Sequence, residues 1–455
     1  MAQESLNYRN LLLFIILVGF VNTTYAQNDQ DLDEDKIDAI FEQWDQDGSP
    51  GCVVGIYQDG ETVFSKGYGE AVLEDHTPIT PETVFYVGSI SKQFTAAAIA
   101  LLAVRGELDL ERPVRDYIPE ISSYPGHRDP TVEELVHHTS GMPDLYSLLR
   151  LYDISLRDGV PKEELLKLIT NQSHLNFEPG SKYMYSNSGY TLLAEIVERV
   201  SGKTLREYTI ENLFEPLGMH HTHFHDDHNH EIDHKALSYR GKKDFKVSYI
   251  SKFEGVGPGG LYSTIGDLEK WDQQLTHNQL PNAKGFNDLM RRQGVLNNGD
   301  TLSYAFALHI DEYKGQKAVG HGGSFMGFKA DYLRLPEHGY GSAILCNLGN
   351  ISPGSLNKKM ADTIFEDAIN EWIHKFEGPY YSEVLDLTYT LTVKDGDLYL
   401  EDQERSPSGK LTYDEANTFS TGSWDFEFNL TEQGEVKGFE VSTGRAKNII
   451  FKKES

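Results

Sequence analysis

Cysteine, positive charge and long apolar runs are all scarce in this chain of 455 residues. Its two cysteines, Cys52 and Cys346, are too few for a disulfide-rich scaffold or a thiolate metal site. The chain has 41 lysines and arginines against 70 aspartates and glutamates, which gives a formal net charge of -29. Such a surface repels phosphate groups, so we expect no nucleic acid and no anionic membrane surface among the partners.

An apolar run near the N-terminus extends from Leu11 to Val21. Its length is too short to span a bilayer comfortably, because a transmembrane helix needs about 20 apolar residues. The run follows Arg9 and precedes Ala26, which is typical of a signal peptide over residues 1–26. An uncleaved anchor is the alternative. We expect a secreted or periplasmic protein with no stable membrane insertion after cleavage.

Patterns that predict strands lie at both ends of a long segment, and helical patterns lie between them. The pair Asp59-Gly60 joins two β-rich runs, which is a strong hairpin signal. The predicted strands are Cys52–Tyr57, Thr62–Phe64, Val319–Phe328, Ala330–Leu335 and Ser342–Asn347. The predicted helices are 31–47, Ser91–Arg105, 188–201 and 355–374. This order predicts an α+β fold with an inserted helical region.

Residues 376–455 differ from the preceding part of the chain in their residue pattern. Short β-rich runs alternate there with Asp-Gly, Pro-Ser-Gly and Gln-Gly turns. The runs are Leu387–Val393, Leu398–Leu400, Trp424–Leu430, Gly438–Val441 and Asn448–Phe451. We predict a separate small all-β domain, barrel-like or sandwich-like, with no catalytic cluster of its own.

Ser89 and Lys92 stand three residues apart at the start of a strongly apolar helical segment. A serine hydroxyl is a weak nucleophile at neutral pH and needs a base beside it. Residues three apart share one face of a helix, so the Lys92 amine can reach Ser89. Burial at the head of this helix favours the neutral amine that such a base must be. The spacing recurs by chance in other proteins and needs support from elsewhere in the chain.

A second group, Tyr185-Ser186-Asn187, lies directly before the predicted helix 188–201. A tyrosine held near positive charge can exist as a phenolate and act as a general base. The Asn187 amide is suited to hold a substrate carbonyl. Taken alone, the group is more typical of a helix cap, because Ser and Asn are frequent at that position.

A third group, His321-Gly322-Gly323-Ser324, lies in a β-rich run. Paired glycines let a backbone approach a ligand closely. Backbone N–H groups at this point can complete an oxyanion hole with the N–H of Ser89. A turn or bulge beside an incidental histidine is the alternative.

The three groups resemble the motifs of penicillin-recognising serine enzymes and occur in the same order. Those motifs are S-x-x-K, then Y-x-N, then a third motif that contains glycine. The resemblance is to the branch with class C β-lactamases, D-aminopeptidases, D-peptidases and related esterases, and covers about residues 33 to 375. Further matching segments are Phe85–Gly88, His138–Met142, Pro216–Met219 and Gly257–Thr264. The resemblance implies a β-lactamase-like domain over residues 27–375, with an antiparallel sheet flanked by helices, followed by the small barrel-like domain.

The resemblance also implies a role for each motif residue. Ser89 would be acylated, Lys92 and Tyr185 would move its proton, and Asn187 would hold the substrate amide. The N–H groups of Ser89 and Ser324 would form the oxyanion hole. His321 and Gly323 occupy the basic and glycine positions of the third motif and would bind substrate. The family implies no metal and no other cofactor.

His321 departs from the lysine that helps hold a substrate carboxylate in β-lactamases and transpeptidases. A histidine at this position resembles aminopeptidase and esterase members, and the tail resembles their lipocalin-like appendages. We therefore expect a serine hydrolase of the D-amino-acid peptidase or esterase type, which forms an acyl-enzyme with amides or esters of small or peptide-like substrates. A class C-like β-lactamase or D-Ala-D-Ala carboxypeptidase is one alternative. A non-catalytic binding or sensor protein is the alternative of another class.

Two features remain outside the motifs. Seven histidines crowd residues 220–234 among acidic residues, and imidazole with carboxylate suits Zn, Ni or Cu. The family has a variable loop here, so we favour a solvated polar loop, with any metal peripheral to the chemistry.

Cys52 and Cys346 lie on strands that are antiparallel neighbours in the family fold, so we expect them to be close. A disulfide depends on register, because a one-residue slip would put the side chains on opposite faces.

Overall fold

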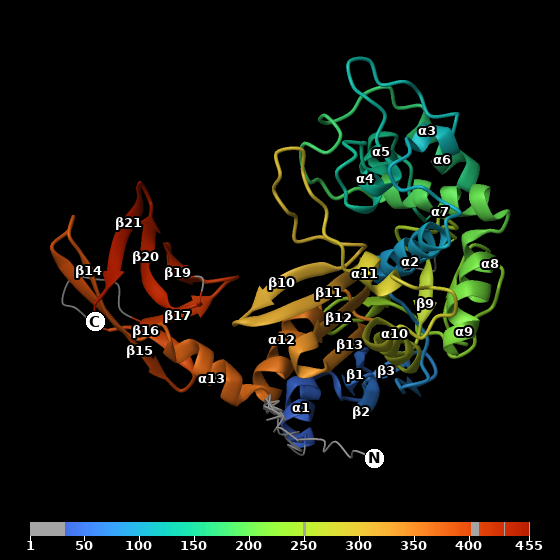
Figure 1. Cartoon of the computed structure of the whole chain (residues 1–455). Helices are drawn as coiled ribbons and strands as arrows, with labels where there is room; N and C mark the ends of the chain where they lie inside the picture. The colour runs from blue at the N-terminus through green and yellow to red at the C-terminus, as the bar shows by residue number, and fades with distance from the viewer. Residues whose placement is uncertain (1–31, 158, 249–251, 402–408, 432, 455) are drawn as a thin grey trace, which may run out of the picture.

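The computed structural model describes residues 32–157, 159–248, 252–401, 409–431 and 433–454. The predicted signal peptide lies outside these residues. Figure 1 shows a larger domain and a smaller β domain, with α13 (Glu366–His374) between them. Within the described ranges, none of the helices has the length and hydropathy that crossing a bilayer requires.

A six-stranded antiparallel sheet forms the centre of the larger domain. Its order is β10-β11-β12-β13-β1-β2, so strands from the two ends of the segment meet where β13 pairs with β1. The strands are β1 (Cys52–Gln58), β2 (Glu61–Tyr68), β10 (His309–Tyr313), β11 (Gln316–Phe325), β12 (Phe328–Leu335) and β13 (Tyr340–Cys346). This topology confirms the predicted α+β fold.

Helices cover both faces of the sheet (Figure 1). α1 (Glu34–Phe41) and α12 (Pro353–Ile364) pack on one face, while α2 (Ser91–Val104) and α10 (Ile265–His277) pack on the other. Successive strand residues serve the two cores in turn, because side chains alternate along a strand. Val53 thus joins the α2 side, and Val54 joins the α1 side.

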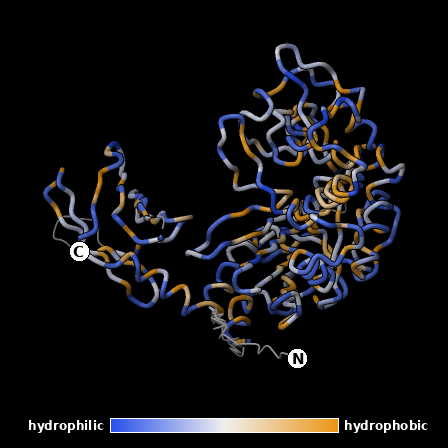
Figure 2. The backbone as a smooth tube through the Cα atoms, viewed as in Figure 1, coloured by the Kyte–Doolittle hydropathy of each residue, from blue (hydrophilic) through white to orange (hydrophobic). Residues whose placement is uncertain are grey.

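The inserted region between β2 and β10 carries the remaining helices and several short strands. Its helices include α3 (Val114–Tyr117), α4 (Val132–Val136), α5 (Leu145–Leu151), α6 (Lys162–Thr170), α7 (Asn187–Ser201), α8 (Leu205–Thr209), α9 (Glu215–Leu217) and α11 (Phe286–Met290). Its short strands include β3 (Glu70–Val72), β4 (Thr77–Pro78), β5 (Phe85–Tyr86), β6 (His223–Phe224), β7 (Tyr239–Arg240), β8 (Lys246–Val247) and β9 (Leu261–Ser263). Figure 2 shows the hydrophobic stretches of this domain mainly in its interior.

The smaller domain is a closed antiparallel barrel, which confirms the predicted all-β tail. Its strands are β14 (Gly378–Ser382), β15 (Leu387–Lys394), β16 (Asp397–Leu400), β17 (Gly409–Tyr413), β18 (Thr418–Thr421), β19 (Trp424–Leu430), β20 (Val436–Thr443) and β21 (Ala446–Lys453). Aromatic rings such as Phe426, Phe428 and Phe439 fill the interior. Trp372 and Ile373 of α13 belong to the same core, so the last helix before residue 376 packs with the barrel.

The tip of the β10–β11 hairpin contacts the barrel. The Tyr413 hydroxyl donates to the carbonyl oxygen of Glu312 at 3.3 Å and accepts from the Lys314 N–H at 3.3 Å. Trp372 lies so close to Gly315 that a Cβ there would be 2.1 Å from the indole. A cavity of about 250 Å³ lies at this seam, lined by residues of both domains.

Cys52 and Cys346 are directly opposed in the β1–β13 pairing and form a disulfide, with Cα atoms 4.0 Å apart. Both side chains lie in the core on the α1 side of the sheet. The expected proximity is therefore confirmed, and the register is the one that puts both sulfurs on the same face.

Three predicted elements are wrong in their extent. The predicted helix 31–47 is only α1 followed by a short 3-10 turn, Glu42–Trp44. The predicted strand Val319–Phe328 ends too late, because Met326 and Gly327 both adopt positive φ and reverse the chain, so that Phe328 already begins the next strand. The predicted helix 355–374 breaks at Phe365, whose ring packs on Tyr340 of the sheet while the next helix turns to the barrel.

Candidate active site

Ser89 lies on a short 3-10 turn, Gly88–Ile90, that follows β5 and leads into α2. The backbone of β11 approaches this turn closely. A Cβ on Gly88, which has φ +60°, would lie 2.4 Å from the Ser324 nitrogen, and a Cβ on Gly323 would lie 2.1 Å from the Val87 carbonyl oxygen. Only glycine fits at either position. The Ser324 backbone nitrogen is thereby held beside the turn Gly88–Ile90. We call this turn the nucleophile turn, after the role predicted for Ser89.

Lys92 is wholly buried in the first turn of α2. Its Nζ donates to three oxygen atoms: Ser89 Oγ at 3.2 Å, Asn187 Oδ1 at 2.9 Å and the Pro258 carbonyl oxygen at 2.7 Å. Burial lowers the pKa of Lys92 to about 7, although the Asp144 carboxylate acts in the opposite direction. Near neutral pH the amine therefore loses its proton readily and can act as a base.

Tyr185 lies in the extended segment that precedes α7, with its ring 4.8 Å from Lys92 Nζ. Burial raises the pKa of the Tyr185 phenol, and the interaction with Ser89 acts in the opposite direction. The phenol is therefore protonated at neutral pH. This disfavours the phenolate interpretation and leaves the Lys92 amine as the group able to accept a proton.

Asn187 is the first residue of α7, and Asp144 fixes its amide group. The Asn187 backbone N–H and its Nδ2 donate to Asp144 Oδ1 at 2.7 and 2.8 Å, which turns Oδ1 of Asn187 toward Lys92. Asp144 also caps α5 by accepting from the Ser147 N–H at 3.0 Å. Sequence reasoning missed Asp144, although it lies two residues after the matching segment His138–Met142.

His321 belongs to a chain of buried hydrogen bonds that joins the second and third motifs. The Ser186 N–H donates to His138 Nδ1 at 3.1 Å, and His138 Nε2 lies 3.2 Å from the Tyr304 hydroxyl. The same hydroxyl lies 3.2 Å from His321 Nε2, and His321 Nδ1 lies 2.6 Å from the Gly322 carbonyl oxygen. One proton assignment satisfies all four contacts: His138 donates to Tyr304, Tyr304 donates to His321, and His321 donates to Gly322.

Both histidines in this chain are neutral. Burial lowers the pKa of His321 to about 3 and that of His138 well below its usual value, and the charge of Lys92 acts in the same direction. The third motif therefore presents an uncharged imidazole where the lysine form presents a cation. Sequence reasoning missed Tyr304, which lies outside the motifs and is joined to both histidines only by the fold.

An aromatic row adjoins the site. Tyr86, just before the nucleophile turn, stacks on Phe325 with ring centroids 4.9 Å apart. Phe253 lies 6.5 Å from Phe325 and 6.3 Å from Tyr146 by the same measure. Tyr146 follows Asp144, and its hydroxyl lies 4.0 Å from a Cβ placed on Gly259. Tyr86 and Phe253 are buried in this row, whereas Phe325 and Tyr146 are half-buried.

The structure brings together all the residues that the three motifs supplied. Ser89, Lys92, Tyr185 and Asn187 are linked by the contacts above, and His321 joins them through Tyr304. The backbone of Gly323 and Ser324 lies against the nucleophile turn, while the Ser324 hydroxyl accepts from Lys329 on the neighbouring strand. Their individual roles stay predictions.

Comparisons with known proteins agree with this geometry. The Beta-lactamase family model matches residues 37–362. A D-aminopeptidase of Cereibacter sphaeroides is 28% identical over 66% of this chain, and the match spans 57% of that enzyme's length. A penicillin-binding protein of Bacillus subtilis is 28% identical over 69% of each chain. The chain thus covers less than two thirds of the D-aminopeptidase that it matches.

The barrel is included in a match to a solved structure. The octameric penicillin-binding protein homologue from Pyrococcus abyssi aligns with a TM-score of 0.65 and 25% identity, covering 92% of this chain and 100% of that one. The family match extends over most of the larger domain and includes Ser89, Lys92 and Tyr185. The chain belongs to the Beta-lactamase family.

Proposed function

We propose that this protein hydrolyses small or peptide-like amides or esters through an acyl-enzyme on Ser89. The state of Lys92 carries the proposal. A wholly buried amine with a pKa of about 7, placed 3.2 Å from the Ser89 hydroxyl, is suited to accept a proton at neutral pH. A lysine with the ordinary pKa would be an ammonium ion at neutral pH and would have no lone pair to accept the proton.

In the proposed reaction, Ser89 Oγ attacks the substrate carbonyl while its proton passes to the Lys92 amine. The N–H groups of Ser89 and Ser324 stabilise the oxyanion of the tetrahedral intermediate. The intermediate collapses to an ester on Ser89 as the bond to the leaving group breaks, and the leaving group takes a proton through the Tyr185 phenol. Water then attacks the ester, gives its proton to the same relay, and Ser89 is released with the acid product.

Two observations favour an aminopeptidase or esterase type over a β-lactamase or carboxypeptidase. His321 is neutral, so the third motif offers no cation to a substrate carboxylate. The half-buried rings of Phe325 and Tyr146, at the aromatic row, offer an apolar surface for an acyl group instead. The match to D-aminopeptidases supports the same choice.

We also propose that the protein is exported. The apolar run Leu11–Val21 has the pattern of a signal peptide. The disulfide between Cys52 and Cys346 supports this location, because such bonds persist in oxidising compartments and are rare in the cytosol.

The mechanism is tested with a fluorophosphonate probe and a panel of p-nitrophenyl esters and D- and L-amino-acid amides. We expect the native protein to be labelled on Ser89, as mapped by mass spectrometry, and to turn over aryl esters or D-amino-acid amides faster than penicillins. Ser89→Ala should retain the fold by circular dichroism and lose labelling and turnover. A Ser89→Ala variant that kept native turnover would refute the mechanism, and tight substrate binding without turnover would favour the sensor alternative.

A further inference from the structure

The histidine-rich loop, residues 220–234, begins at a short sheet and then runs out into solvent. Its strand β6 pairs with β9, and His223 and His225 are half-buried against Tyr262 of β9. Residues 227–231 are exposed, as expected for a solvated polar loop. This exposed part contacts a second segment of the chain, the one that precedes β9.

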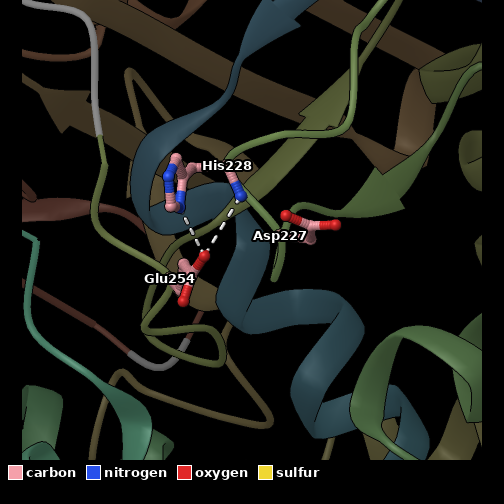
Figure 3. A group of neighbouring side chains, drawn as sticks. All are labelled: Asp227, His228 and Glu254. Carbon is pink, nitrogen blue, oxygen red and sulfur yellow. Dashed lines mark hydrogen bonds and ion pairs between the residues drawn. The ribbon is translucent and has the colours of Figure 1, made fainter.

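Asp227 and His228 of the loop meet Glu254 of that segment (Figure 3). Each side chain offers one ligand atom, and the three atoms lie within 4.8 Å of one another. Within the described residues, this is the only group of three or more His, Cys, Asp or Glu side chains with such a spacing. The group therefore has the composition and the closeness that one metal ion requires.

The two nearest atoms of the group show how an ion would enter. His228 Nδ1 and Glu254 Oε1 lie 2.6 Å apart and form a hydrogen bond. Two ligand atoms of a tetrahedral zinc ion lie about 3.3 Å apart, given bonds of roughly 2.0–2.1 Å. An ion would therefore replace this hydrogen bond, the two groups would separate by about 0.7 Å, and the ring would keep its proton on Nε2.

Backbone contacts already position the two carboxylates. The His228 N–H donates to Glu254 Oε1 at 3.2 Å, which fixes that carboxylate to the loop. Asp227 Oδ1 accepts from the backbone N–H and from Nδ2 of Asn229, at 2.9 and 3.1 Å. Among the described residues no group donates to Asp227 Oδ2, so this oxygen is available to a cation.

The group also carries negative charge that no basic side chain offsets. Within the described part of the chain, neither Asp227 nor Glu254 forms an ion pair with a lysine or an arginine. The preceding residue, Asp226, is different, because its carboxylate pairs with Arg206 at 3.1 Å. Two unpaired carboxylates beside one imidazole favour a divalent cation, and zinc accepts both kinds of ligand.

We propose that Asp227, His228 and Glu254 bind one divalent transition-metal ion of the zinc class, with water completing its coordination. The site is separate from Ser89 and takes no part in the acyl transfer. The ion links the histidine-rich loop to residues 252–260, which lie directly before β9 and are neither helix nor strand.

This link matters because residues 252–260 serve the candidate active site. Phe253 belongs to the aromatic row, and the Pro258 carbonyl oxygen accepts from Lys92 Nζ at 2.7 Å. A segment without regular secondary structure depends on side-chain contacts for its position. A metal ion on Glu254 adds such a contact between these two residues. Its expected effect is a more heat-resistant site with unchanged chemistry.

The test uses the full-length protein after chelation and dialysis, titrated with Zn²⁺ by calorimetry. We expect one equivalent of Zn²⁺ per chain and a melting temperature raised by roughly 2–4 °C at a hundredfold excess over Kd. X-ray absorption of the zinc-loaded protein should show one imidazole ligand and otherwise oxygen ligands. Aryl-ester hydrolysis at room temperature should be the same with and without the ion, and inactivation on heating should be slower with it.

Variants of the three ligands assign the site. His228→Gln removes the imidazole, and Asp227→Asn with Glu254→Gln removes both charges. Each variant should weaken Zn²⁺ binding at least about tenfold and lose the rise in melting temperature. The three side chains are exposed or half-buried, so circular dichroism should show a native fold in both variants.

Two control variants separate this site from its rivals. His220→Asn with His221→Asn alters exposed histidines of the same loop, and Asp226→Asn alters the neighbouring paired carboxylate. Both should bind Zn²⁺ as the native protein does. Equal losses in the histidine control and in His228→Gln would show unspecific binding by a histidine-rich stretch. That result, native binding in both ligand variants, or no stoichiometric binding would overturn the proposal.

Discussion

Cys52 and Cys346 are joined side by side across β1 and β13, although 294 residues separate them in the sequence. The bond links the first and last strands of the segment at the centre of the sheet. Everything inserted between them, including the nucleophile turn and the α7 region, is therefore enclosed in one covalent loop.

We expect the variant Cys52→Ala with Cys346→Ala to fold with a melting temperature lowered by several degrees. Disulfides typically contribute about 2–4 kcal/mol by restricting the unfolded chain. Thermal unfolding measured with and without a reductant checks this. Reduction should lower the stability of the native protein and leave the variant unchanged. Two free thiols in the native protein, found by mass spectrometry after alkylation without reduction, would contradict the expectation.

The pH dependence of kcat/KM should report Lys92. Its pKa is lowered to about 7, so below that pH it is an ammonium ion that cannot accept the Ser89 proton. Activity on an uncharged ester should therefore rise with pH through about 7 and then level off. Asp144→Asn removes the carboxylate that raises this pKa, so the midpoint should move to lower pH. A midpoint unmoved in that variant would contradict the assignment of the titration to Lys92.

Tyr304→Phe should impair positioning of the third motif. The change removes the hydroxyl that links His138 Nε2 to His321 Nε2 and leaves two buried nitrogen atoms without that partner. We expect a loss of stability of about 1–3 kcal/mol and a lower kcat. The His321 ring should keep its Nδ1–H tautomer, which the Gly322 carbonyl oxygen still fixes, and its Nε2 signal in the ¹⁵N spectrum should shift because the hydrogen bond from Tyr304 is lost. Tyr183→Phe is the matched control, because its ring lies 5.8 Å from Tyr304 outside the chain of hydrogen bonds, and it should leave the Nε2 signal unshifted.

The solubility of a truncated chain should depend on whether it ends before or after α13. A chain that ends at Phe365 keeps the ring that packs on Tyr340 and removes α13 with the barrel, so we expect soluble, folded catalytic domain. A chain that ends at residue 375 exposes Trp372 and Ile373, which belong to the barrel core, and should aggregate more. The aggregation of the two truncated chains is compared by light scattering, and their folding by circular dichroism. Insolubility of both would show that the barrel completes the core of the larger domain.

Much of the fold could be predicted because local signals and packing agree. Asp59 and Gly60 both adopt positive φ in the β1–β2 hairpin, as the Asp-Gly pair indicates. The β11–β12 turn places Met326 and Gly327 in the same region, and Met carries no such signal. That turn is held by pairing of its strands, so the sequence pattern predicts both strands but places the turn too late, after Phe328.

Some residues of the candidate site could be predicted from local sequence, and others could not. Ser89, Lys92, Tyr185 and Asn187 belong to local motifs whose residue types indicate their chemistry. The Pro258 carbonyl oxygen that contacts Lys92 is backbone and leaves no trace in the residue type. Asp144 and Tyr304 reach the motif residues only through tertiary packing, so no short pattern could have identified them.

The β10–β11 hairpin connects the barrel with the candidate active site. Its tip contacts Trp372 and Tyr413, and the same strand β11 contains His321 and Ser324. Figure 1 shows the hairpin of β10 and β11 extending toward the barrel. The strand from Gln316 to Ser324 is about 27 Å long at roughly 3.4 Å per residue. The barrel and the nucleophile turn therefore contact the two ends of one continuous strand, and a shift of the barrel at this seam would act on the same backbone that lies against Gly88.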